Sequence, residues 1–195
     1  MTSSPRTPFR PLAVFMGVMT LAWASNAVEA APVPAALFVL LGLAVIVGAV
    51  RGRRARRTAP EERTAPRSAP SVPTVPGRTA SLLALVEVIG ILATVLLLAR
   101  TGHVELVMPA VAVVVAAHFA LFLRAQRSWL HLVTSTLGVL GAGNALVLVA
   151  IGVLDPAAGR ALAGLSLAAC TALYGIVFCA VVPAPAPPVL DGARS

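Results

Sequence analysis

The 195-residue sequence contains no lysine, and only 11% of its residues carry a charge. Soluble domains use charged residues at about a quarter of their positions, so this chain is not an ordinary soluble globule. Aromatic residues make up 5% of the chain and are not interleaved with the arginines, which argues against a base-stacking surface for nucleic acid. What remains is a chain that is 58% hydrophobic, with a mean hydropathy of +0.93.

Residues that carry chemistry are equally scarce, with three histidines and two cysteines in the whole chain. Cys170 and Cys179 are nine residues apart on one predicted helix, about 13 Å along its axis, which is too far for a disulfide. No histidine and cysteine spacing matches a zinc site, and no glycine-rich phosphate loop precedes a polar helix. Ser166 and Tyr174 have no evident base at their predicted depth. We therefore expect no enzyme activity, no metal and no cofactor.

Six apolar runs predict six transmembrane helices, because backbone groups in lipid must satisfy one another. The runs cover approximately 11–28, 33–50, 81–99, 104–123, 129–154 and 158–182. The expected fold is an all-α membrane bundle divided into 1–50 (N-terminus and two helices), an arginine- and proline-rich cytoplasmic loop at 51–80, 81–182 (four helices) and a tail at 183–195. The loop and the tail are expected to be disordered, because they have little apolar surface to bury.

An arginine cluster directly follows the second run and consists of Arg51, Arg53, Arg54, Arg56 and Arg57. Loops rich in arginine stay on the cytoplasmic side of a membrane. With this loop inside, 13 of the 15 arginines are cytoplasmic, and only Arg100 and Arg160 lie outside. The count predicts cytoplasmic N- and C-termini. The arginines between residues 51 and 78 are also expected to contact anionic lipid headgroups.

Two segments allow a second interpretation. Arg6 and Arg10 precede an apolar run that ends at Val28-Glu29-Ala30, as in a cleaved signal peptide, although the run is long for one. Cleavage would leave five helices and an external N-terminus. The repeats Arg57-Thr-Ala-Pro60 and Arg63-Thr-Ala-Pro66 indicate either a solvated linker or a tether released from lipid by phosphorylation, the linker being favoured.

Two ionisable residues, Glu87 and His118, lie inside the predicted third and fourth spans, about 9 Å and about 8 Å from the inner boundary. The short turn Arg100-Thr-Gly-His103 makes these spans an antiparallel hairpin, which brings the two residues to one level. They form either an interhelical hydrogen bond or a proton-responsive site of a transporter or sensor. The same face of the third span continues only as Gly90 and Thr94, which favours the structural interpretation.

Small residues recur at four-residue spacing in the fifth span, which permits close helix contact. The residues expected to pack there are Gly138, Gly141, Ala142 and Asn144. Packing inside one bundle is favoured over a seam between two copies.

The pair His118-Phe119, shortly before Arg124, together with the arginine loop, resembles small six-span membrane proteins of unknown function from GC-rich bacteria. The resemblance implies no activity. We expect a multi-pass protein of the bacterial plasma membrane, a non-catalytic packing or partner-binding component. Its partners would be the lipid bilayer and another membrane protein or a second copy, and not nucleic acid. The alternative is a small proton-linked transporter or pH-responsive sensor centred on Glu87 and His118.

Overall fold

A computed structural model describes residues 9–58, 77–125 and 128–180, and nearly all of this part of the chain is helical. The elements are α1 (Phe9–Ser25), α2 (Pro32–Thr58), α3 (Gly77–Arg100), η1 (Val104–Leu106), α4 (Val107–Ala125), α5 (Trp129–Ala150) and α6 (Pro156–Ala180). The described ranges contain no strand, so the predicted all-α class is confirmed for them. Five helices are long and apolar enough to cross a membrane, whereas the apolar part of α1, Pro11–Ser25, is shorter.

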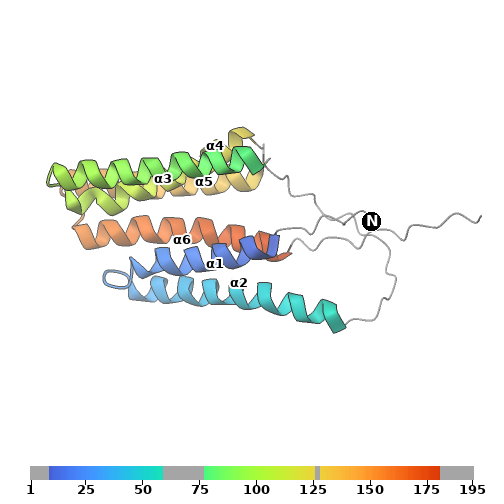
Figure 1. Ribbon diagram of the computed structural model, residues 1–195. Helices are drawn as coiled ribbons and strands as arrows, with labels where there is room; N and C mark the ends of the chain where they lie inside the picture. The colour runs from blue at the N-terminus through green and yellow to red at the C-terminus, as the bar shows by residue number, and fades with distance from the viewer. Residues whose placement is uncertain (1–8, 59–76, 126–127, 181–195) are drawn as a thin grey trace, which may run out of the picture.

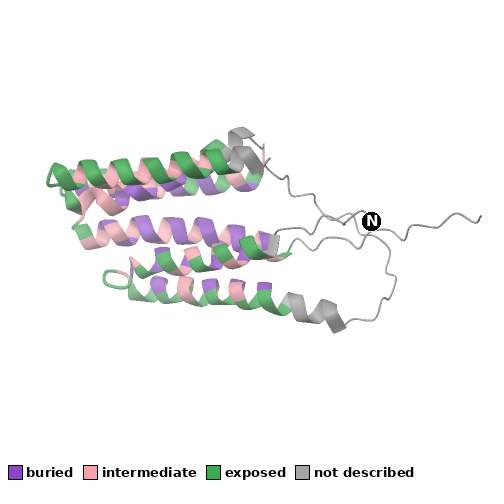
Figure 2. Ribbon diagram, in the orientation of Figure 1, coloured by how far each residue is buried: buried purple, intermediate pink, exposed green. Residues whose placement is uncertain are grey.

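Helix α6 is the centre of the bundle and contacts α1, α2, α4 and α5 (Figure 1). Helices α1 and α2 lie on one side of it, and α5, α4 and α3 follow on the other. Burial follows this order: 12 of the 25 residues of α6 are buried, whereas no residue of Ser81–Arg100 in α3 is buried (Figure 2). Helix α3 is therefore a peripheral helix, held mainly by α4.

The turns that join α1 to α2, α3 to α4 and α5 to α6 lie at one end of the bundle, and two of them use the same glycine-based helix ending (Figure 1). Gly102 after α3 and Gly152 after α5 have φ angles of +81° and +74°. The following residue donates its N–H back to the helix, from His103 to the Leu98 carbonyl at 2.9 Å and from Val153 to the Leu148 carbonyl at 2.8 Å. This is the Schellman motif, which favours glycine because side chains disfavour positive φ.

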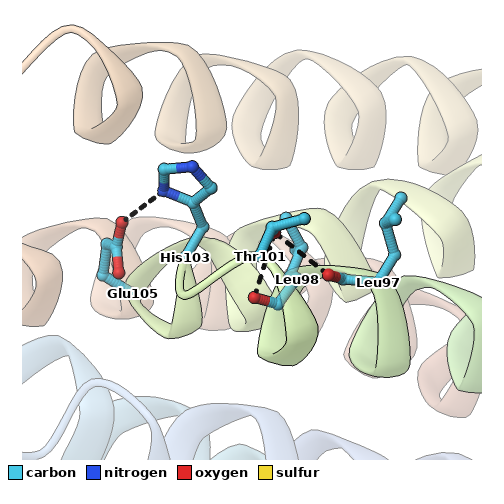
Figure 3. Close-up of polar contacts among 5 residues, drawn as sticks. All are labelled: Leu97, Leu98, Thr101, His103 and Glu105. Atoms are coloured by element: carbon cyan, nitrogen blue, oxygen red, sulfur yellow. Dashed lines mark hydrogen bonds and ion pairs between the residues drawn. The ribbon is translucent and has the colours of Figure 1, made fainter.

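Side chains complete the turn between α3 and α4 (Figure 3). The Thr101 hydroxyl donates to the Leu97 carbonyl at 3.0 Å, and His103 Nδ1 lies 3.3 Å from Glu105 Oε1. These groups are exposed and take no part in the bundle interior. Contacts within the turn therefore fix the antiparallel arrangement of α3 and α4.

Asp155 and Pro156 fix the start of α6. The Asp155 carboxylate accepts a hydrogen bond from the Ala158 N–H at 2.9 Å, which is the contact of a helix N-cap. Pro156 occupies the first helical position, where its missing N–H costs nothing. Because Gly152 and Asp155 separate the two helices, α5 ends at Ala150 and not at 154 as predicted from hydropathy.

Helix α2 continues beyond the second predicted span, whose apolar part in the structure, Pro32–Arg51, agrees with the prediction of 33–50. Helix α2 runs to Thr58, through the arginine cluster, because arginine and alanine are good helix formers and the next proline is Pro60. Helix α3 begins at Gly77, directly after Pro76. The ends of the predicted 51–80 loop are thus helical, while its centre at 59–76 and the tail at 183–195 lie outside the described residues.

Candidate functional site

Glu87 on α3 and His118 on α4 face each other inside the apolar part of the bundle. Glu87 Oε2 lies 3.6 Å from His118 Nε2, within ion-pairing range when the imidazole is protonated. The Glu87 side chain is 23% exposed and the His118 side chain 11% exposed, so the pair is mostly but not completely buried. The antiparallel hairpin brings the two residues to the same level on neighbouring helices.

The surroundings of this pair are apolar and tightly packed. The edge of the Phe119 ring lies against His118, with ring centroids 6.3 Å apart. One turn after Glu87, a Cβ added at Gly90 would come within 3.0 Å of Val114 Cγ1, so α3 and α4 nearly touch there. An apolar wall strengthens any charge interaction between the two side chains, because there is little water to screen it.

A second polar cluster connects α5 and α6, and its centre is Tyr174. The Tyr174 hydroxyl forms a hydrogen bond with His131 Nδ1 and lies 3.1 Å from the Thr134 hydroxyl. Cys170, one turn earlier on α6, donates its thiol to the Thr134 carbonyl at 3.2 Å. Tyr174 is only 3% exposed, so its hydroxyl depends on these partners.

This cluster corrects the expectation that Tyr174 has no base at its depth, because His131 reaches it. The sequence contained a weak signal: His131 lies in the first turn of α5 and Tyr174 lies toward the end of α6, so an antiparallel pair brings both toward one end. Counted from the α5–α6 turn, the two residues lie at the same level, since His131 is 19 residues before the end of α5 and Tyr174 is 18 residues after the start of α6. Ser166, by contrast, donates to the Leu162 carbonyl of its own helix.

Phe119 separates the two polar groups. Its ring centroid lies 5.2 Å from that of Tyr174, which in turn stacks on Phe178 at 5.8 Å. One imidazole therefore lies on each side of Phe119, together with one acidic side chain. On one side the carboxyl group of Glu87 faces His118, and on the other the phenol of Tyr174 contacts His131. Both pairs contain groups that exchange protons.

The predicted packing residues of α5 divide into two groups. Gly138 and Ala142 are buried, and a Cβ at Gly138 would lie 2.9 Å from Ala116 Cβ of α4. A Cβ at Gly141 would overlap the Ser166 side chain of α6, so this glycine also permits helix contact. Asn144 is different: it is exposed and forms no hydrogen bond with the described residues, so it does not belong to the packing set.

The arginine cluster is described only in part. Arg51 is exposed on α2, and the side chains of Arg53, Arg54, Arg56 and Arg57 lie outside the described residues. Within the described ranges, no three histidine, cysteine or acidic residues gather closely enough to hold a metal ion.

Comparison of the chain with protein-family models, curated proteins and solved structures finds no match. Its assignment therefore rests on its own residues: an all-helical bundle with five helices long and apolar enough to cross a membrane.

Proposed function

We propose that this chain is a multi-pass protein of the bacterial plasma membrane that binds a partner membrane helix through α3 and does not catalyse a reaction. The observation that supports the proposal is the position of α3. This helix packs mainly against α4, and none of its residues between Ser81 and Arg100 is buried. Because α3 packs mainly against one other helix, most of its surface is free to contact a partner.

The exposed side of α3 carries an ordered stripe directly opposite Glu87. Leucine or isoleucine recurs at alternating spacings of three and four, and all five side chains are more than half exposed: Leu82, Leu85, Ile89, Leu92 and Leu96. Such spacing is the pattern that places side chains of one helix into the gaps of another. The contact of Glu87 with His118 holds the opposite face against α4, and so fixes which way the stripe points.

A photoactivatable side chain at Ile89 tests this proposal in living membranes. Leu40 on α2 provides the matched control, because both positions are exposed, at 57% and 63%. We expect a discrete protein adduct from Ile89 and only lipid adducts from Leu40. Glu87→Leu should weaken the Ile89 adduct by letting α3 rotate. Lipid adducts alone at both positions would refute partner binding through α3, and an adduct with the same chain would identify the partner as a second copy.

The proposed orientation places the N- and C-termini in the cytoplasm. Two of the 15 arginines, Arg100 and Arg160, lie beside the α3–α4 and α5–α6 turns. In the sequence, the other 13 lie around the start of α1, around the α2–α3 and α4–α5 connections, and after α6. A charge difference of this size favours retention of the arginine-rich end inside. In a chain without its native cysteines, a cysteine at Thr101 should react with an impermeant thiol reagent added outside intact cells, and a cysteine at Ser128 should not.

The 3.6 Å distance between Glu87 and His118 favours a second candidate function, a small proton-linked transporter or pH-responsive sensor. Ionisable groups inside a membrane are costly, and they are most often retained for a task. In proteoliposomes with an imposed pH gradient, this function requires a proton flux that Glu87→Gln abolishes. Absence of flux in the wild-type protein would rule out proton transport and leave partner binding as the proposal.

A further inference from the structure

A groove of about 380 Å³ lies between α2 and α6, near the arginine-bearing end of α2. Its walls are Leu41, Ala44, Val45 and Gly48 of α2 and Ile176 and Cys179 of α6. None of these side chains carries a charge. Along α2 the groove extends over about 10 Å, from Leu41 to Gly48, at 1.5 Å per residue.

The groove exists because the two helices touch at one level and carry small side chains at the next. A Cβ at Gly175 would lie 2.7 Å from Val45 Cγ1, so α6 and α2 are in close contact there. One turn later, a Cβ at Gly48 would meet only Cys179 Sγ, at 4.0 Å. The Cys179 thiol donates to the Val45 carbonyl at 3.5 Å and forms part of the floor.

One end of this apolar groove is cationic. The α2 residues that line it lie at helical spacings of three and four, and Arg51 comes three residues after Gly48, on the same face of the helix. Arg51 is exposed and opens the arginine cluster that α2 carries to Thr58. Toward its start, at Pro32, α2 carries only apolar residues. The surface therefore fits a ligand with an apolar chain and an anionic head.

We propose that this groove is a binding site for an anionic phospholipid of the inner leaflet. One acyl chain lies against Gly48 and Cys179, and the phosphate lies at Arg51. Arginine binds phosphate through charge-assisted, bidentate hydrogen bonds, and basic sites between transmembrane helices bind anionic headgroups in this way. The site involves α2 and α6 and does not depend on the partner-binding stripe of α3.

Retention of lipid by the purified full chain tests the proposal. The protein is extracted from membranes that contain equal amounts of phosphatidylglycerol and phosphatidylcholine, and the bound lipid is measured by native mass spectrometry. We expect one phosphatidylglycerol per chain, with phosphatidylcholine retained at least tenfold less often. Arg51→Gln should reduce phosphatidylglycerol retention about tenfold, because the charge-assisted hydrogen bonds to the phosphate are lost. This exposed residue can change without disturbing the packed interior.

A groove-filling variant and its control test the acyl-chain part of the site. Gly48→Leu should abolish retention, because the new side chain fills the groove. Gly143→Leu on α5 is the control, since a Cβ there would meet no atom within 4 Å, and it should retain the lipid. Equal retention of both lipids, or equal loss in both glycine variants, would overturn the proposal. A Cys179–Cys179 cross-link formed in membranes would also overturn it, because a second copy would then occupy the groove.

Discussion

The hydroxyl of Thr20 on α1 lies 3.0 Å from the hydroxyl of Thr171 on α6, and both side chains are buried. Each hydroxyl also lies close to a carbonyl of its own helix, Met16 at 2.8 Å for Thr20 and Leu167 at 2.9 Å for Thr171. Thr20→Val removes the interhelical bond but leaves Thr171 able to donate to Leu167. We therefore expect a loss of only about 0.6 kcal/mol in the free energy of unfolding, the usual size of such bonds in membranes.

A double-mutant cycle measures this contribution. Thr20→Val, Thr171→Val and the double variant are unfolded reversibly in mixed micelles, and the coupling energy is taken from the four stabilities. A coupling near zero would mean that each hydroxyl bonds only to its own helix.

Glycines at helix contacts should tolerate alanine very differently from glycines that face open space. Gly138→Ala places a Cβ 2.9 Å from Ala116 Cβ, so α4 and α5 must separate, and overpacking of this kind costs about 1–3 kcal/mol. Gly143→Ala meets no atom within 4 Å and should be neutral or stabilising, because alanine is the better helix former. Thermal denaturation in detergent should give a lower midpoint for the first variant only, and equal midpoints would contradict the close α4–α5 contact.

Glu87 should control how firmly α3 is attached to the bundle. Glu87→Gln keeps a hydrogen-bonding side chain opposite His118, so we expect α3 to stay in place. Glu87→Leu removes the carboxylate that faces His118, so the ion-pairing contact between α3 and α4 is lost. Hydrogen exchange measured by mass spectrometry should then rise several-fold in α3 for Glu87→Leu, and remain near wild type for Glu87→Gln. If both variants showed wild-type exchange rates in α3, apolar packing alone would be sufficient to hold the helix.

Tyr174→Phe isolates the hydroxyl of the α5–α6 cluster. The ring contacts with Phe119 and Phe178 are retained, whereas His131 and Thr134 lose a buried partner. Each of the two lost hydrogen bonds contributes about 0.5–1.5 kcal/mol, so the variant should unfold more easily by about 1–3 kcal/mol. A variant as stable as wild type would indicate that water replaces the hydroxyl.

The sequence was sufficient to predict the helices and the level of Glu87 and His118, because hydropathy determines the spans and a short turn determines that two spans are antiparallel. It did not predict the contact of His131 with Tyr174. That contact depends on the rotation of α5 and α6 about their axes, and both helices are apolar on all sides, so no polar face indicates the rotation. The continuation of α2 beyond the membrane span was missed for a different reason: hydropathy falls at Arg51, but the helix continues to Thr58.

The central position of α6 has a consequence for the order of assembly. During translation α6 emerges after the five other helices, yet α1, α2, α4 and α5 all pack against it. Before it arrives, the α1–α2 pair and the α4–α5 pair have no common surface to join them. A ribosome that stops before Pro156 would therefore leave the α1–α2 hairpin and a three-helix unit of α3, α4 and α5 in the membrane, and quality-control proteases would meet these two parts before they pack together.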